Sequence, residues 1–193
     1  MPWKYKFFKP KEVLSPDGLQ QLERNNWIRC QEHALIALEE WRHWVDVMIS
    51  INFADHVRRG YRSSEENRAV KGGKDSAHVQ GIAFDQTPHN YPCFDFFVMA
   101  VYWSYLRYKA GLIAYRGIGI YPQSNFMHGD FRHNQDDLLI LWNGYTKKLL
   151  TKAVKFDNID FKNLDTWLVS ELNLPAHWKL TKFTINELLQ RTL

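Results

Sequence analysis

The chain has 193 residues, of which 45% are hydrophobic and 24% are charged, and these proportions are ordinary for a soluble globular protein. This length predicts one domain, or one domain with an appendage, and no apolar stretch approaches the ~20 residues of a membrane span. The only cysteines, Cys30 and Cys93, exclude a disulfide framework, and the net charge of +4 comes from basic residues interspersed with acidic ones, which does not favour nucleic-acid binding.

The first residues carry positive charge without an apolar run behind them, which is not the pattern of a secretory signal. We therefore expect synthesis in a cytoplasm. If the protein acts outside that cell, another factor must release it.

The first half of the chain predicts a helix followed by two strands. Residues 19–47 place apolar side chains at spacings of three and four, which indicates one helix face. Residues 48–53 alternate apolar and polar side chains, as a strand does. Residues 58–75 are polar and rich in turn formers, which predicts a surface loop, and residues 76–86 predict a short strand.

The second half predicts a helix, a hairpin and a helical extension. Residues 94–110 indicate an amphipathic helix that ends near Gly111, a residue suited to a C-terminal cap. Residues 117–132 predict a hairpin. We therefore predict one domain of residues 1–132 and a C-terminal extension of residues 133–193, with helices over residues 136–153, 163–172 and 184–191.

Three side chains of metal-binding type occur in two segments, His78 and Asp85 in the first and His128 in the hairpin. His78 and Asp85 are seven positions apart and cannot share a face of one regular strand, but a bend at Gly81 would direct both at one ion. Two imidazoles and a carboxylate suffice for a catalytic zinc ion that keeps its fourth position open for water. From spacing alone, structural or solvated histidines remain an alternative.

A zinc ion that cleaves peptides needs further groups beside it. Bound zinc lowers the pKa of water toward ~7 and polarises a carbonyl, and a general base carries the proton to the leaving amine. Asp130 is the predicted base because strand periodicity places His128, Asp130 and Arg132 on one face. Arg62 is the predicted oxyanion stabiliser. The alternatives are a salt-bridged Asp130 and an ordinary surface Arg62.

Four segments together resemble the D-alanyl-D-alanine carboxypeptidase-like zinc peptidases, a group that includes D-Ala-D-Ala dipeptidases, phage L-alanyl-D-glutamate endolysins and the hedgehog domain. The most specific feature is Ser-x-His-x-x-Gly-x-Ala-x-Asp at residues 76–85, followed downstream by His-x-Asp at residues 128–130. The resemblance covers about residues 7–132 and is carried by residues 60–67, 72–85, 117–122 and 126–132.

The resemblance implies an α+β fold in which a small antiparallel sheet, flanked by helices, forms the floor of a zinc cleft. It implies zinc on His78, Asp85 and His128. It also implies that Arg62 acts on the substrate or transition state and that Ser76 binds substrate. The implied substrates are the stem peptides and cross-bridges of peptidoglycan, and the implied setting is a phage-encoded enzyme that acts on the host cell wall after release.

The chain departs from parts of this family at the position of the base. The dipeptidases have a glutamate three residues before the last zinc histidine, where this chain has Asn125, and other members have a histidine where it has Phe126. The chain follows the branch with His-x-Asp, which supports Asp130. The departure also supports an alternative, an inactive binding or virion-assembly module that retains the fold. In that case the C-terminal extension would contact a partner, or itself, through Trp142, Leu149, Trp167, Leu168 and Trp178.

Overall fold

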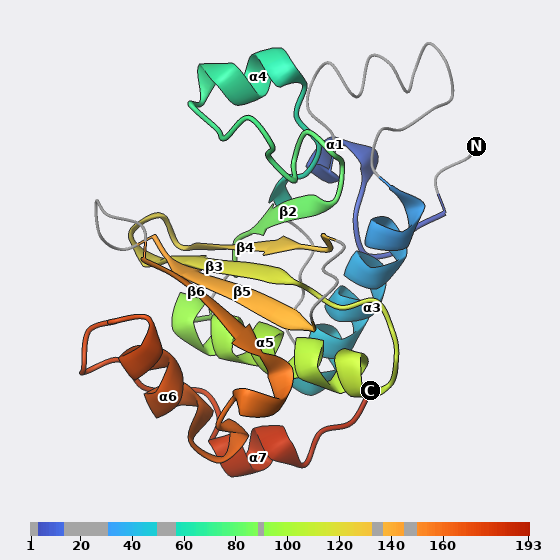
Figure 1. Ribbon diagram of the computed structural model, residues 1–193. Coiled ribbons are helices and arrows are strands. Elements are labelled where there is room, and N and C mark those ends of the chain that lie inside the picture. The colour runs from blue at the N-terminus through green and yellow to red at the C-terminus, as the bar shows by residue number, and fades with distance from the viewer. Residues whose placement is uncertain (1–3, 14–30, 50–56, 89–90, 133–136, 145–149) are drawn as a thin grey trace. The chain divides into compact units, whose positions relative to one another are not determined.

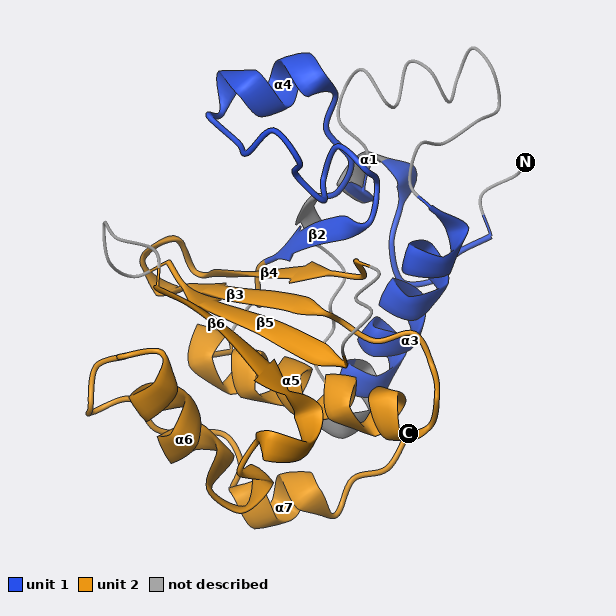
Figure 2. Ribbon diagram, in the orientation of Figure 1, with its two compact units in different colours: residues 1–86 blue, residues 87–193 orange. Residues whose placement is uncertain are grey.

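The computed structural model describes residues 4–13, 31–49, 57–88, 91–132, 137–144 and 150–193. They form two compact units, residues 1–86 and residues 87–193, which Figure 2 draws in different colours. Each unit contains both helices and strands, so the chain has the α+β class that the sequence predicts. Within the described residues, no helix combines the length and the apolar character needed to cross a membrane.

The first unit is built on one long helix and one strand pair (Figure 1). Its elements are α1 (Pro10–Val13), α3 (Glu32–Ile49), β1 (Val57–Arg59), α4 (Ser64–Ala69) and β2 (Ala83–Gln86). The strands β1 and β2 pair antiparallel. Trp41, on the buried face of α3, donates a hydrogen bond from Nε1 to Gln86 Oε1 over 2.9 Å. This bond fixes the end of β2 to the helix.

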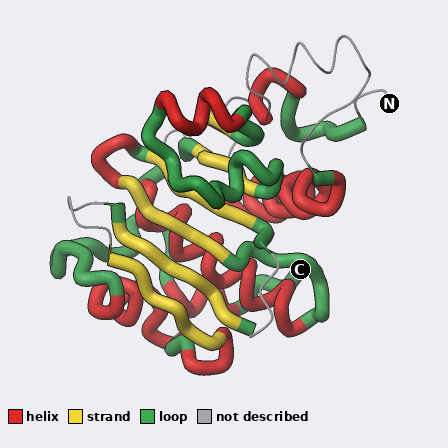
Figure 3. The backbone as a smooth tube through the Cα atoms, turned by 45° about the horizontal axis from the view of Figure 1, so that its top comes forward, coloured by secondary structure: helices red, strands yellow, loops and turns green. Residues whose placement is uncertain are grey.

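The second unit is a four-stranded sheet with helices around it. The strands lie in the order β4-β3-β5-β6. Figure 3 shows strands in yellow and the helices in red. The pairs β3–β4 and β5–β6 are antiparallel, and β3 and β5 are parallel. The elements are α5 (Cys93–Lys109), β3 (Gly117–Tyr121), η1 (Pro122–Ser124), β4 (Phe126–Asp130), β5 (Leu138–Asn143), β6 (Leu150–Lys155), η2 (Phe156–Asn158), η3 (Phe161–Asn163), α6 (Leu164–Glu171) and α7 (Ile185–Leu189).

Side-chain alternation gives this sheet a core face and a second face. Ile118, Ile120 and Met127 have no exposed surface, and α5 packs against the strands β3 and β4 that carry them. Gly119 and His128, which alternate with these residues, belong to the opposite face. The helix therefore supports the sheet from behind, and the chemistry-bearing side chains lie on the other side.

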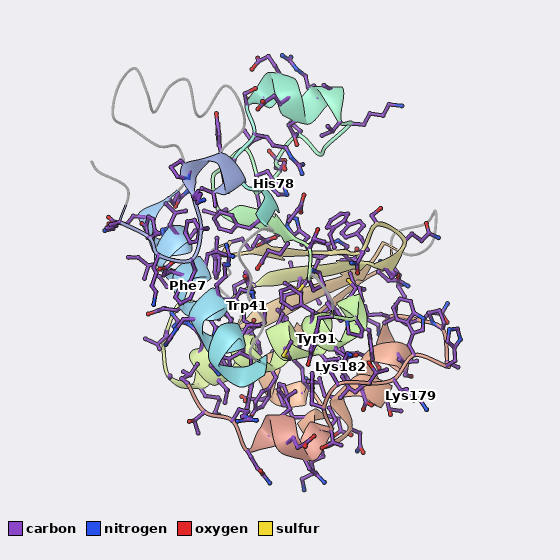
Figure 4. All side chains as sticks on the ribbon, turned by 180° about the vertical axis from the view of Figure 1, so that it is seen from behind. Phe7, Trp41, His78, Tyr91, Lys179 and Lys182 are labelled. Carbon is purple, nitrogen blue, oxygen red and sulfur yellow. The ribbon has the colours of Figure 1, made fainter. Side chains whose placement is uncertain are left out.

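A buried carboxylate holds the C-terminal segment against α5. Asp95 Oδ2 accepts hydrogen bonds from the backbone N–H groups of Thr181, over 2.9 Å, and Lys182, over 2.8 Å. Phe183, the next residue after Lys182, stacks on Tyr91 with the ring centroids 6.5 Å apart. Figure 4 labels Tyr91 and Lys182 in this part of the second unit. Burial raises the pKa of Asp95, although these hydrogen bonds act in the opposite direction.

Several predicted elements are confirmed. The helix at residues 94–110 is α5, and Gly111 follows it with a φ of +68°, as a glycine after a helix end does. The hairpin is β3 and β4, and the helices at residues 163–172 and 184–191 are α6 and α7. The helix predicted at residues 19–47 is present as α3 from Glu32 onward, and residues 19–30 lie outside the described residues.

The helix predicted at residues 136–153 is wrong, because residues 138–143 form β5 and residues 150–153 belong to β6, while residues 136 and 145–149 lie outside the described residues. The run Leu138–Asn143 is apolar through Trp142, and a short continuous apolar run has no period that separates a buried strand from a buried helix. The parallel pairing of β5 with β3 also makes the sheet mixed rather than wholly antiparallel. The domain boundary predicted at residue 132 stays a prediction.

Three further predictions need correction. The loop predicted at residues 58–75 contains α4, which begins with a reciprocal capping box between Ser63 and Glu66. Only Ala83–Gln86 of the strand predicted at residues 76–86 is extended, and turns precede it. Met48 and Ile49 of the strand predicted at residues 48–53 belong to α3, and the rest of that strand lies outside the described residues.

The residues predicted for a partner contact differ in how far they are buried. Leu168 is fully buried, Trp142 is 8% exposed within β5, and Leu149 lies outside the described residues. Trp167 and Trp178 are half-buried. The partner contact itself stays a prediction.

Candidate metal centre

The orientation of His78 is fixed by the backbone. Its Nδ1 lies 2.7 Å from the carbonyl oxygen of Gly60, and because a carbonyl oxygen only accepts hydrogen bonds, Nδ1 carries the proton and donates. In the neutral imidazole, Nε2 then carries a lone pair. The side chain is buried. This is the tautomer and the restraint expected of a histidine that binds a metal through Nε2.

Asp85 faces that lone pair from β2. Its Oδ1 lies 3.2 Å from His78 Nε2, and its Oδ2 accepts a hydrogen bond from Arg62 Nη2 over 2.6 Å. Nε2 of the neutral imidazole and the carboxylate oxygen both carry lone pairs, so a cation, either a proton or a metal ion, must lie between them for the contact to be favourable. Nitrogen and oxygen donors in a buried position suit zinc.

The bend predicted at Gly81 is confirmed. Gly81 has a φ of +73°, in the region that favours glycine, and its N–H donates to the His78 carbonyl oxygen over 3.1 Å. The chain therefore turns between His78 and Asp85, as the shared use of one ion requires. Ser76 Oγ accepts a hydrogen bond from the His78 N–H over 3.3 Å, so the serine stabilises the same turn.

His128 lies on β4 beside a buried ion pair. Its Nε2 is 3.3 Å from Asp130 Oδ2, and its side chain is 12% exposed. Asp130 has no exposed surface, and Arg132 donates to both of its oxygens, from Nε over 2.6 Å and from Nη2. The three side chains therefore share one strand face, as their alternation predicts.

The protonation of Asp130 follows from these contacts. Burial acts to raise the pKa of the carboxyl, but hydrogen bonds from Arg132 and His128 outweigh it and hold the pKa at about 2. Asp130 is thus an anion that accepts hydrogen bonds on both oxygens. A general base works best when its pKa is near the operating pH, and the pKa of Asp130 is far below neutral pH.

One aromatic contact was not anticipated as part of the site. The ring of Trp142, on β5, lies with its centroid 5.0 Å from that of His128. The sequence placed Trp142 in a predicted helix, where no alternation could relate it to the hairpin. The parallel pairing of β5 with β3 brings it to this position.

The described residues contain one group of histidine and acidic side chains that could hold a metal ion, namely His78, Asp85 and His128. The peptidase M15 family model matches residues 13–130, more than half of the chain and the whole of this group. The chain belongs to the peptidase M15 family. This confirms the resemblance to zinc peptidases. Comparisons of this M15 chain with curated proteins and with solved structures gave no significant match.

Proposed function

We propose that this M15 family member is a zinc metallopeptidase that hydrolyses peptide bonds in the stem peptides or cross-bridges of peptidoglycan. The observation that carries the proposal is the contact of His78 Nε2 with Asp85 Oδ1, two atoms that can bind a metal, 3.2 Å apart within the segment that the family model matches. The peptidoglycan substrate and the phage-type setting rest on the resemblance of that motif to wall-cleaving peptidases.

The proposed zinc ligands are His78, Asp85 and His128. When bound, zinc supplies an acidified water and a Lewis acid for the scissile carbonyl. The chain's own residues hold the ligands in place. The Gly60 carbonyl fixes the His78 tautomer, and Asp130 accepts from His128 Nε2. Such partners of metal-bound imidazoles set ring orientation and raise ligand basicity.

Arg62 fits two tasks in this proposal. Its Nη2 donates a hydrogen bond to Asp85 Oδ2 and leaves Asp85 Oδ1 directed at His78. Arg62 Nε is buried without a hydrogen-bond partner among the described residues. Because a guanidinium has five N–H donors, Arg62 can hold Asp85 and still donate to a substrate oxygen on which negative charge develops. Ser76, which the resemblance assigns to substrate binding, is proposed to act from the turn before His78.

We propose a changed role for Asp130. The sequence predicts it as the general base, but it is fully buried, ion-paired with Arg132 and held at a pKa of about 2. These properties suit a residue that positions His128 better than one that accepts and releases protons at each turnover.

The test is mass spectrometry of purified peptidoglycan digested with the wild-type chain, with and without chelator. We expect fragments with new amine and carboxylate ends that disappear with chelator and in His78→Ala. The matched control is His177→Ala, which removes an exposed histidine of the second unit and should leave the digestion unchanged. Intact peptidoglycan from several wall types, with zinc confirmed in the protein, would overturn the proposal.

Two observations favour one second candidate, a wall-binding module that retains the metal but lacks a base. Asp130 is buried and ion-paired, and Asn125 stands where the dipeptidases have their glutamate base. Co-sedimentation with purified walls distinguishes the two functions. A binding module would sediment with walls without cleaving them, and it would do so equally well as His78→Ala.

A further inference from the structure

Trp142 lies beyond the residues that the family model matches, yet strand register aligns it with the ligand His128. In the parallel pair β3–β5, Gly119 is opposite Trp142, and in the antiparallel pair β3–β4, Gly119 is opposite His128. The three residues therefore form one row across three neighbouring strands, with glycine in the middle. Side chains in such a row lie on the same face of the sheet.

The glycine in the middle leaves space that the indole occupies. A Cβ atom on Gly119 would lie 2.1 Å from Trp142 Nε1 and 2.2 Å from its Cε2, distances that no side chain tolerates. The indole thus lies directly over the Gly119 backbone. From there it reaches the imidazole of His128, with the two ring planes at 51° to each other.

The indole is itself held in place. Trp142 Nε1 donates to the hydroxyl oxygen of Tyr121 over 2.8 Å, and the Tyr121 ring stacks on Phe126 with centroids 4.4 Å apart. Trp142 is 8% exposed. A side chain fixed by burial and by a hydrogen bond at its polar end can transmit its position to a neighbour.

We propose that Trp142 is a positioning residue for the metal ligand His128. Asp130 restrains the imidazole through Nε2, and Trp142 restrains its ring through van der Waals contact, so the two together select one orientation of the ligand. The inference rests on the proposed zinc site and extends it to a strand outside the matched family segment.

The experiment measures zinc affinity by chelator competition in the full-length chain, together with the visible absorption spectrum of the cobalt-substituted protein. We expect Trp142→Leu to weaken zinc binding roughly 10-fold and to change the cobalt spectrum. Trp142→Phe should give a smaller change, because it keeps a ring against His128 but loses the Nε1 hydrogen bond. Trp167→Leu, a half-buried tryptophan of α6, is the matched control and should match the wild type on both readouts.

Gly119→Ala tests the same idea with Trp142 retained, since the added methyl group must displace the indole. It should reproduce the loss of zinc affinity and the altered cobalt spectrum, and it provides an answer if Trp142→Leu fails to fold. Wild-type zinc affinity and an unchanged cobalt spectrum in Trp142→Leu or in folded Gly119→Ala would overturn this inference and leave the proposed function standing.

The proposed function fails in a different way. A wild-type chain that binds no zinc would overturn both proposals. A wild-type chain that binds zinc but cleaves no peptidoglycan would overturn the peptidase function, while weakened zinc binding in the Trp142 variants would still support the positioning role.

Discussion

The same combination of side chains occurs twice around the proposed ligands. An arginine donates to an aspartate, and that aspartate faces an imidazole nitrogen, first in Arg62–Asp85–His78 and again in Arg132–Asp130–His128. The two carboxylates differ in access, because Asp85 retains some exposed surface and Asp130 has none. We infer that the first carboxylate is a ligand and the second supports one.

Removal of any proposed ligand should release the metal. We expect His78→Ala, Asp85→Ala and His128→Ala to purify with little zinc and without measurable hydrolysis, because two remaining donors hold the ion too weakly. Metal content by mass spectrometry of the purified protein measures this directly. His177→Ala should retain full zinc content, and a ligand variant that does the same would remove that residue from the ligand set.

The Asp130→Asn variant separates a positioning residue from a base. If Asp130 positions His128, the Asp130→Asn variant should bind zinc roughly 10- to 100-fold more weakly, and saturating zinc should restore most of the activity. The measurement is hydrolysis rate as a function of free zinc, with Asp137→Asn as a surface control. Unchanged zinc affinity with a rate at least ~100-fold lower at saturation would instead identify Asp130 as the base.

The low pKa of Asp130 also predicts a pH dependence of stability in the metal-free chain. Folding lowers this pKa from 3.8 to about 2, so the ionised form is favoured in the native state. The contribution to the free energy of unfolding, about 2 kcal/mol, is complete above the ordinary pKa and is lost as the pH falls through the native value.

Urea unfolding of metal-free wild type and Asp130→Asn over that range of pH tests this expectation. The stability difference between the two proteins should shrink as the pH is lowered toward about 2. A difference that stays constant with pH would show that Asp130 has an ordinary pKa in the folded chain.

At the scale of elements, predictability followed the range of the interactions involved. The β3–β4 hairpin and α5 were predicted because their signals, alternation and helical spacing, are local. The strand β5 was missed because its partner β3 is distant in sequence and its apolar run has no period. The helix α4 was missed although its capping pair, Ser63 and Glu66, was readable in the sequence.

In the candidate site, too, the features carried by a local motif were predictable and those set by tertiary structure were not. The residues His78, Asp85 and His128 follow from a short motif with fixed spacing. The protonation of Asp130 depends on its burial and on the Arg132 contact, and neither can be read from spacing. The approach of Trp142 depends on strand register, which tertiary structure sets.

A truncation tests the importance of β5 as an element. A chain of residues 1–132 lacks β5, and this leaves the backbone groups of β3 that pair with residues 140–143 without partners. We expect this fragment to lose cooperative thermal unfolding and zinc affinity, measured by circular dichroism and chelator competition. A chain that ends at Phe183, which lacks α7 but retains the four strands, is the control. A folded, zinc-binding 1–132 fragment would show that β5 is dispensable.

At the scale of the whole molecule, the chain divides into two compact units, residues 1–86 and residues 87–193. Within the second unit, the Asp95 carboxylate ties the backbone of Thr181 and Lys182 to α5. Asp95 is one of several contacts between the C-terminal segment and α5, and the Tyr102 hydroxyl, farther along the helix, hydrogen-bonds to the carbonyl oxygens of Leu189 and Arg191 over 3.2 and 3.3 Å.

Loss of the Asp95 carboxylate should loosen the C-terminal segment. Asp95→Ala removes the acceptor of the Thr181 and Lys182 N–H groups, and we expect it to lower the free energy of unfolding by about 2 kcal/mol. Asp95→Asn retains an acceptor oxygen and should lower the free energy of unfolding by a smaller amount. Amide hydrogen exchange of residues 178–189 should accelerate most in Asp95→Ala, and uniform acceleration over the whole chain would argue against a local tie.

The closeness of Trp142 to His128 has a spectroscopic consequence. An indole whose ring centroid lies 5.0 Å from that of an imidazole ligand is within range of quenching by a paramagnetic ion bound to that imidazole. Cobalt or copper added to the metal-free chain should quench the fluorescence of this tryptophan, and the Trp142→Phe variant should lose that component of the quenching. The molecule thus contains its own optical reporter of metal occupancy.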